Sequence, residues 1–234
     1  MLLPRVCAAC GRPLQSADEG LICGRCWSRL DLLPAPQCRR CGHPTPERGD
    51  CTWCALLPPF VRAVRSVCTV HTGAGLSIVA ALKYDGWAAV ADGMAERMAR
   101  LAWPIDVAEE RAAVVPVPLA ASRQRERGYN QSELLARGLS RRWDIPVWPR
   151  CIERARVTTS QTHLTPGERR RNVAGAFRAV PGAVKFRGTH LVLVDDVVTT
   201  AATLNECATA LHEAGARIVS YVTFGRAPAL GDRW

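Results

Sequence analysis

The segment "LVLVDDVVTTAATL", residues 191–204, joins an apolar run to two adjacent acids and a group of threonines. The continuous apolar run from Leu191 to Val194 is typical of a strand in the middle of a parallel sheet. Asp195 and Asp196 follow it directly. Because neighbouring carboxylates repel each other and are costly to bury, a diacid at the end of a buried strand predicts a site rather than a part of the core.

The residues that follow predict a strand–helix–strand unit. Residues 203–214 are expected to be helical, with Leu204, Cys207 and Leu211 on one stripe and Gly215 as the stop signal. The segment "RIVSYVTF" predicts the next strand. The acidic pair would then lie at the carboxyl end of a parallel strand, which is the edge where open α/β sheets bind ligands.

The hydroxyls, the small side chains and the backbone N–H groups at the predicted helix start favour an anion-binding cradle. Its members would be Thr199, Thr200, Ala201, Ala202 and Thr203. Carboxylates beside a phosphate would repel it unless they face hydroxyl groups or a hydrated divalent cation. A ribose 5-phosphate meets both demands, with its phosphate in the cradle and its 2- and 3-hydroxyls on the aspartates.

Three other interpretations compete for the same segment. An apolar run followed by acids also occurs in nucleoside triphosphatases, but the chain has no G-x-x-x-x-G-K-[ST] motif. A dinucleotide fold would need G-x-G-x-x-G, and "GAGLSI" at Gly73 lacks the third glycine. A purely structural diacid that caps a helix stays open.

Eight of the eleven cysteines form four Cys-x-x-Cys pairs. The pairs are Cys7/Cys10, Cys23/Cys26, Cys38/Cys41 and Cys51/Cys54. Each pair points two thiolates at one metal, so sequential pairing predicts two four-cysteine structural zinc sites with no open position for catalytic water. Disulfides or thioredoxin-type redox chemistry are the alternatives, and neither explains four evenly spaced pairs. We expect a double zinc-ribbon domain over 1–58 and a second domain over 59–234.

Further elements are expected in the second domain. Strands are predicted at "VRSVCTV" and "AAVVPVP", and helices at "GLSIVAALKYDG", "WAAVADGMAERMARLA" and after Asn130, where Glu133 completes a start signal. The polar, basic segment "ERARVTTSQTHLTPGERRRNVAGAF" shows no sustained period and predicts a long loop.

Charge is unevenly placed along the chain. The 234 residues carry a net charge of +10, and residues 123–178 alone hold 13 Arg and no Lys against 5 acids. Arginine suits bidentate capture of phosphate, although a genome that favours Arg over Lys would produce the same excess. The sequence shows no secretory signal and no apolar run of about 20 residues, so we expect a soluble, cytoplasmic protein without membrane insertion.

These motifs together resemble a known family. The segment "VLVDDVVTTAAT" is similar to the phosphoribosyl pyrophosphate (PRPP) motif of type I phosphoribosyltransferases. The segments "VPVPL…SRQRERGYNQSELLAR", "SQTHLTPGERRRNVAGAF" and "LKYDG" resemble the ComF family of competence-associated proteins, which also carries an amino-terminal zinc ribbon. The resemblance spans nearly the whole chain. It implies a type I phosphoribosyltransferase fold, an open and mostly parallel sheet flanked by helices, with a small zinc-ribbon domain.

The resemblance also implies roles for individual residues. Asp195 and Asp196 would hold the ribose hydroxyls, and residues 199–203 the 5-phosphate. The loop after "VPVPL" would face the pyrophosphate with Arg123, Arg125 and Arg127. Residues 154–164 would form a lid, and Mg²⁺ would arrive bridging pyrophosphate and ribose oxygens. Lys83 would either touch the pyrophosphate or only end a helix.

One position departs from the family pattern. The usual "TTGAT" is "TTAAT" here, with Ala201 in the place of the glycine. If that residue needs a positive φ, alanine costs on the order of 1 kcal/mol.

Two functions of different classes follow. The first is Mg²⁺-dependent phosphoribosyl transfer from PRPP to an unidentified acceptor. The second is a non-enzymatic accessory of DNA uptake, which binds single-stranded DNA or competence-machinery proteins while the PRPP pocket senses a ligand or is idle. An Asp195→Asn change separates them, because it should abolish the first function and spare nucleic-acid binding.

Overall fold

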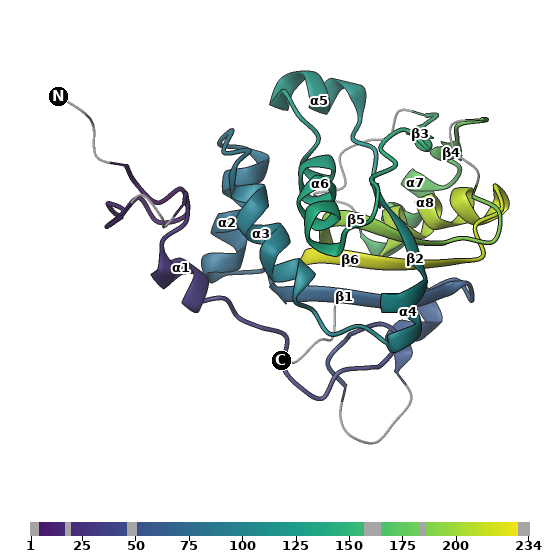
Figure 1. Cartoon of the computed structure of the whole chain (residues 1–234), viewed down its shortest axis with the longest axis horizontal. Coiled ribbons are helices and arrows are strands. Elements are labelled where there is room, and N and C mark those ends of the chain that lie inside the picture. Colours follow the sequence, from purple (N-terminus) through teal and green to yellow (C-terminus); the bar gives the residue numbers. More distant parts are fainter. Residues whose placement is uncertain (1–4, 17–19, 46–50, 157–164, 183–185, 229–234) are drawn as a thin grey trace.

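A four-stranded parallel sheet in the order β1–β6–β5–β2 forms the centre of the molecule (Figure 1). Its strands are β1 (Val61–Thr69), β2 (Arg111–Pro116), β5 (His190–Val198) and β6 (Ile218–Arg226). This computed structural model describes residues 5–16, 20–45, 51–156, 165–182 and 186–228. All four strands expected from the apolar runs are confirmed, with small shifts of their ends.

Strand β5 runs four residues further than its apolar run. Its pairing with β2 stops at Val194, opposite Pro116. Its pairing with β6 continues through Asp195, opposite Thr223, to Val198, opposite Arg226. The diacid therefore lies inside the strand, not after it. From Asp195 onward β5 has no ladder partner on its β2 side, and this leaves space at the carboxyl edge of the sheet.

One face of the sheet is covered by three helices, α2 (Gly73–Lys83), α3 (Val90–Ala99) and α6 (Gln131–Trp143). Their buried residues pack on Val192, Val194 and Phe224, and we call this cluster the α6-side core. Helices α3 and α6 approach so closely that a Cβ on Gly138 would lie 2.5 Å from the Ala95 Cβ. Within the described part of the chain, no helix is long and apolar enough to cross a membrane.

The opposite face is covered by α8 (Ala202–Glu213) together with smaller elements. Leu204, Cys207 and Leu211 are buried against the sheet, as their helical spacing predicted, and with Leu191, Leu193 and Tyr221 they belong to what we call the α8-side core. The predicted long loop was wrong in part. It contains α7 (Pro166–Val173), and its two ends belong to β3 (Ile152–Arg154) and β4 (Phe177–Ala179), which pair antiparallel.

The periodicity of that segment was misleading because strands of three residues are too short to alternate. Part of the expected lid, residues 157–164, lies outside the described residues. Four further short elements complete the structure. They are α1 (Gly24–Ser28), a 3-10 helix (Thr52–Leu56), α4 (Ile105–Glu110) and α5 (Ala121–Arg127).

The two cysteine-rich segments pack onto opposite faces of the sheet. Cys7, Ile22 and Cys26 belong to the α6-side core, and the Trp27 ring contacts the Phe224 ring edge-on at a centroid distance of 6.3 Å. Cys41 and Trp53 belong to the α8-side core. Neither segment is therefore a separate appendage, because each completes one face of the sheet.

Candidate functional site

A pocket of about 440 Å³ opens at the carboxyl edge of the sheet, where β5 has lost its β2 neighbour. Its walls come from the end of α2, the β2–α5 connection, α5, the start of α6, β3 and the β5–α8 connection. Its polar lining consists of Lys83, Tyr84, Ser122, Arg123, Arg127, Gln131, Ser132, Arg154, Asp195, Asp196, Thr199 and Thr203. The diacid, most of the threonine segment and the basic residues expected from separate parts of the sequence thus meet in one pocket.

The two aspartates have different surroundings. Asp196 is buried, and its Oδ2 lies 2.9 Å from the Lys83 Nζ at the end of α2. Burial alone would lower the pKa of Lys83, but the charge of Asp196 outweighs it and raises the pKa overall. Lys83 therefore stays protonated and compensates the inner carboxylate, which removes much of the repulsion within the diacid. Lys83 thus ends α2 and also lines the pocket, where it forms an ion pair with Asp196.

Asp195 is the partly exposed member of the pair. Its Oδ1 accepts hydrogen bonds from the Ser132 hydroxyl at 2.8 Å and from the Asp196 backbone N–H at 2.9 Å. Burial and the neighbouring charge of Asp196 raise the pKa of Asp195 to about 7. A carboxyl group that titrates near neutral pH in a polar pocket is typical of a functional site.

The segment "RGYNQ" holds the pocket wall together. Asn130 caps α6 as expected, because its Oδ1 accepts from the Ser132 N–H at 3.1 Å, and its Nδ2 donates to the Val117 carbonyl at 3.0 Å. The Tyr129 hydroxyl donates to the Leu82 carbonyl at 2.5 Å, next to Lys83. This segment therefore joins the ends of α2, β2 and α6 around Asp195.

The predicted phosphate cradle lies at the start of α8. Thr199, Ala201, Ala202 and Thr203 line the pocket, whereas Thr200 does not. Ala201 is the N-cap residue with φ 57° and ψ 8°, so this position does have the left-handed conformation that the family glycine would favour. The N–H groups in the first turn of a helix have no acceptor within the helix, so the start of α8 gives this end of the pocket a positive potential.

The arginine segment is a helix, not the loop that we expected. Helix α5 has no buried residue and ends at Gly128, whose φ is 83°. Arg123 and Arg127 line the pocket, and Arg125 lies outside its lining. Figure 1 shows α5 at the top of the view, standing away from the sheet. Of the three arginines of this segment, Arg123 and Arg127 thus belong to the pocket wall, and Arg125 belongs to the outward face of α5.

Sequence reasoning missed four polar residues that line the pocket, Ser122, Gln131, Ser132 and Arg154. Ser132 follows the N-cap of α6, and its bond to Asp195 spans 63 positions of sequence. Arg154 was expected only as the start of a lid, but it lines the pocket from β3 with its guanidinium 4.8 Å from the centre of the Phe177 ring. Burial lowers the pKa of Arg154. The position of Ser132 in the first turn of a helix that starts at the pocket was the sequence signal that could have identified it.

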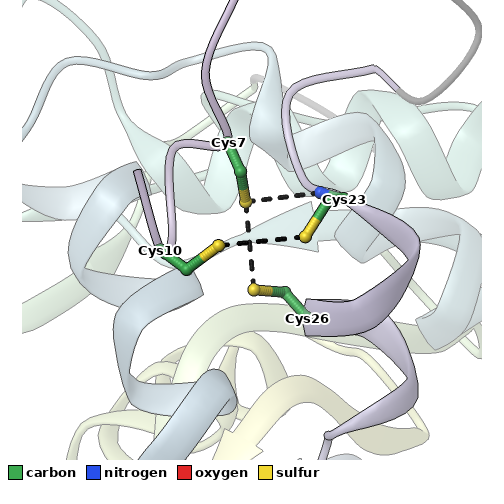
Figure 2. A group of neighbouring side chains, drawn as sticks. All are labelled: Cys7, Cys10, Cys23 and Cys26. Atoms are coloured by element: carbon green, nitrogen blue, oxygen red, sulfur yellow. Dashed lines mark hydrogen bonds between the residues drawn. The ribbon is translucent and has the colours of Figure 1, made fainter. Parts of the chain in front are cut away.

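The eight paired cysteines form two clusters, as sequential pairing predicted. Cys7, Cys10, Cys23 and Cys26 make the first cluster, and Cys38, Cys41, Cys51 and Cys54 the second. Within each cluster the Sγ atoms lie within 4.8 Å of one another. Figure 2 shows the first cluster, with the four sulfur atoms pointing to a common centre.

Both clusters fit tetrahedral zinc. Four sulfurs bound at about 2.3 Å to one tetrahedral Zn²⁺ lie roughly 3.8 Å apart. The Cys7–Cys26 and Cys10–Cys23 sulfur distances are both 3.9 Å, and in the second cluster Cys38–Cys54 is 3.4 Å and Cys41–Cys51 is 3.3 Å. Burial raises the pKa of Cys26 and that of Cys41, so a divalent cation is needed for four thiolates to coexist.

Glycine shapes one turn in each cluster. Gly11 and Gly42 directly follow the second cysteine of a pair and have φ of 70° and 65°. Their N–H groups donate to the carbonyls of Cys7 and Cys38 at 2.8 and 2.9 Å. Glycine at these two positions permits the tight backbone of the turns. Zinc held this way is structural, because four thiolates leave no position for a substrate.

The first prediction concerns zinc stoichiometry. We expect two Zn²⁺ per chain in the purified protein, and one in each of the variants Cys26→Ala and Cys41→Ala, because each variant breaks only one cluster. Elemental mass spectrometry on folded protein measures the ratio. A wild type with a single zinc, or a variant that loses both, would contradict two independent clusters.

The second prediction concerns Ala201. The left-handed conformation of this residue destabilises the fold by about 1–2 kcal/mol when the residue has a Cβ. Glycine removes this cost, but it destabilises the fold by about 0.4–1 kcal/mol because it makes the unfolded chain more flexible. We therefore expect Ala201→Gly to raise the free energy of unfolding by up to about 1 kcal/mol, measured by denaturant titration. The matched control Ala202→Gly, in the first turn of α8, should lower it. The opposite order of the two variants would show that Ala201 is not strained.

Comparisons with known proteins agree with this geometry. Residues 1–55 match the family model of the double zinc ribbon domain, and residues 93–234 match that of the phosphoribosyl transferase domain. DNA utilization protein YhgH of Salmonella typhimurium is 33% identical over 227 residues, which cover 94% of this chain and 96% of the relative.

Two further relatives carry competence names. Competence protein F of Haemophilus influenzae is 39% identical over 115 residues, which cover 49% of this chain and 50% of the relative. Competence protein ComFC of Bacillus subtilis is 26% identical over 199 residues, which cover 83% of this chain and 79% of the relative. The expected fold class is confirmed, and the chain belongs to the ComF and YhgH family, in which a double zinc ribbon precedes a phosphoribosyl transferase domain.

Proposed function

We propose that the pocket binds PRPP together with Mg²⁺ and that the protein transfers the phosphoribosyl group to an acceptor. One observation carries this proposal: the diacid of β5 and the amino-terminal end of α8 line the same pocket. A ligand that touches both must present hydroxyl groups to carboxylates and an anion to backbone N–H groups. A ribose 5-phosphate does so, and the pocket volume of about 440 Å³ lies in the ordinary range of about 300–1,000 Å³ for small-molecule sites.

The basic residues around the pocket suit the second anionic group of this donor. The pocket lining contains four basic side chains and two carboxylates. The basic ones are Lys83, Arg123, Arg127 and Arg154. Lys83 is engaged by Asp196, which leaves Arg123 and Arg127 as the cations on the α5 wall. In the proposed complex they face the pyrophosphate, and guanidinium groups suit its planar, bidentate recognition.

The residues divide the chemical work as follows. In the reaction the C1–oxygen bond to pyrophosphate breaks, pyrophosphate leaves with the electron pair, and a nucleophilic atom of the acceptor bonds to C1. Asp195 holds the ribose hydroxyls and orients C1, while the arginines stabilise the charge of the departing pyrophosphate. Mg²⁺ bound with the donor would supply further neutralisation of the charge on the pyrophosphate. Asp196 is neutralised by Lys83, so the diacid does not form a metal cage of its own.

The names of the relatives support a role in the same biological process. Proteins called competence protein and DNA utilization protein match much of this chain. Helix α5 exposes Arg125 outside the pocket, on a helix with no buried residue, and this outward face suits phosphate groups of a nucleic acid. The second candidate function is therefore a cytoplasmic accessory of DNA uptake that binds single-stranded DNA or competence-machinery proteins. Arg125→Ala should weaken single-stranded DNA binding in this case, and Asp195→Asn should not.

The third prediction tests PRPP binding directly. We expect micromolar, Mg²⁺-dependent binding of PRPP to the zinc-loaded protein in calorimetric titration. Asp195→Asn should weaken it by at least about tenfold, since it replaces a charged hydrogen-bond acceptor that is worth about 1.5–3 kcal/mol. The control Asp144→Asn makes the same chemical change at the exposed left-handed C-cap of α6, where asparagine is tolerated, and should leave binding unchanged.

The wild type decides the proposal. If the folded, zinc-loaded protein binds neither PRPP nor ribose 5-phosphate, the enzymatic function is wrong. If binding occurs, pyrophosphate release in the presence of candidate acceptors measures turnover.

The fourth prediction is a pH dependence. Because the pKa of Asp195 is raised to about 7, this carboxyl is mostly protonated in the free protein at pH 6 and mostly ionised at pH 8. The ionised form is the better acceptor for ribose hydroxyls, so affinity for ribose 5-phosphate should rise from pH 6 to pH 8. The groups that act on Asp195 are Asp196, Lys83, Ser132 and, through its charge, Arg154.

The ligand phosphate also titrates near pH 6, and the Asp195→Asn variant controls for it. The variant should show only the part of the rise that belongs to the phosphate. An identical pH profile in both proteins would mean that Asp195 does not titrate in this range.

A further inference from the structure

The second cysteine cluster and the candidate phosphate loop, residues 199–201, pack into the same core, although the two are far apart in sequence. Cys41 and Trp53 share the α8-side core with Ala201 and Ala202, and all four are buried. The loop is flanked by β5 on one side and by α8 on the other. Both flanks are hydrogen-bonded, directly or through β6, to the segment that carries this cluster.

On the helix side the connection is Asn205. This residue lies in the first turns of α8, where its N–H donates to the Ala201 carbonyl at 2.8 Å. Its side-chain Nδ2 donates to the Leu56 carbonyl at 2.7 Å, two residues after Cys54. Its Oδ1 accepts from the Tyr221 hydroxyl at 3.0 Å. The start of α8 is thus hydrogen-bonded to the backbone that follows the second cysteine cluster, and we call residues 38–56 the second ribbon.

On the strand side the connection is Arg226. Its backbone lies opposite Val198 in the β5–β6 pairing, just before the loop begins. Its side chain is fully buried, donates from Nη2 to the Cys41 carbonyl at 2.6 Å, and lies over the Trp53 ring at 5.0 Å from the ring centre. A guanidinium group is buried only where it has such partners, so its position depends on the shape of the second ribbon.

The loop needs support from outside because its conformation is strained. Ala201 has φ 57°, which costs a residue with a Cβ about 1–2 kcal/mol. Such a conformation persists only where the surrounding structure determines it. In a relative with glycine at this position the loop would be less strained, so this chain depends more on its neighbours.

The first cluster has no equivalent connection among the described residues. It packs into the α6-side core on the opposite face, where Trp27 contacts Phe224 and the Arg97 guanidinium. The two clusters have the same ligands and differ in what they touch. The chain therefore contains its own control for the effect of losing one zinc.

We propose that the second cysteine cluster positions the 199–201 loop through Asn205 and Arg226, so that zinc binding at this cluster and the conformation of the loop are coupled. Asn205 and Arg226 are positioning residues, since neither lines the pocket. The consequence for ligand affinity rests on the proposed function. The effect on the loop itself does not.

The fifth prediction therefore concerns the exchange rate of the loop amides, measured without a ligand. Hydrogen–deuterium exchange followed by mass spectrometry compares zinc-loaded wild type with Cys51→Ser and Cys10→Ser, each of which removes one cysteine that is not fully buried from one cluster. In Cys51→Ser the peptide covering residues 198–206 should exchange about tenfold faster, because the loop opens more often. In Cys10→Ser it should stay within about twofold of the wild type. Equal changes in both variants, or none in either, would overturn the proposal.

Two further variants separate positioning from loss of fold. Asn205→Asp keeps an oxygen for the Tyr221 hydroxyl and replaces the donor to the Leu56 carbonyl with a repelling carboxylate. It should reproduce the faster exchange while both zinc ions stay bound. Tyr221→Phe keeps the Asn205–Leu56 bond and should leave the loop within about twofold of the wild type. Wild-type exchange in Asn205→Asp would also overturn the proposal.

Titration of ribose 5-phosphate completes the experiment. We expect about tenfold weaker binding in Cys51→Ser and in Asn205→Asp than in Cys10→Ser. By linkage, ribose 5-phosphate should slow the loss of the second zinc to a chromophoric chelator by a similar factor. Ligand affinity that is equal in all three variants would overturn the consequence for binding, and the exchange result would still decide the coupling between zinc and loop. If no variant and no wild type binds the sugar while the exchange result holds, the coupling stands and the proposed function fails.

Discussion

The ion pair between Lys83 and Asp196 is the interaction around which the candidate site is arranged. Two adjacent carboxylates cannot both remain charged in a pocket wall without compensation. Lys83 reaches the inner one at 2.9 Å from the end of α2. The outer one, Asp195, then faces the pocket with the Ser132 hydroxyl as its partner. Two identical side chains thereby acquire different tasks, one structural and one available to a ligand.

This arrangement requires several distant segments to meet. The Tyr129 hydroxyl holds the end of α2 through the Leu82 carbonyl, and Asn130 holds the end of β2 through the Val117 carbonyl. Both residues belong to the turn that starts α6. The loss of the β2 partner beyond Val194 then leaves room for a ligand beside β5. Among the described residues, the pocket is therefore built from strand ends, helix ends and the short connections between them.

Much of the fold could be predicted because its signals are local. The apolar runs gave the four sheet strands, the stripe of Leu204, Cys207 and Leu211 gave α8, and cysteine spacing gave the pairing within both clusters. The diacid and the threonine segment also follow each other in sequence, so their shared location could be expected.

The remainder depends on contacts between distant residues. The Ser132–Asp195 bond spans 63 positions and the Arg226–Cys41 bond spans 185, and no spacing rule connects such pairs. Helix α5 was missed because it buries no residue and so has no apolar stripe. Strands β3 and β4 have three residues each, which is too short for a period to appear. Arg154, which lies on β3, was missed as a pocket residue for the same reason.

The contact of Trp27 with Phe224 joins the beginning of the chain to its last strand. Roughly 200 residues lie between the two rings in the sequence. Because a ribosome adds about 5–20 residues per second, Phe224 is synthesised on the order of 10–40 s after Trp27. During this interval β5 and β6 do not yet exist, so the ribbons lack the complete sheet on which they pack. The eight zinc ligands all lie within residues 7–54, which are synthesised first. The ribbons can therefore acquire metal and the order it supplies before the core that receives them is complete.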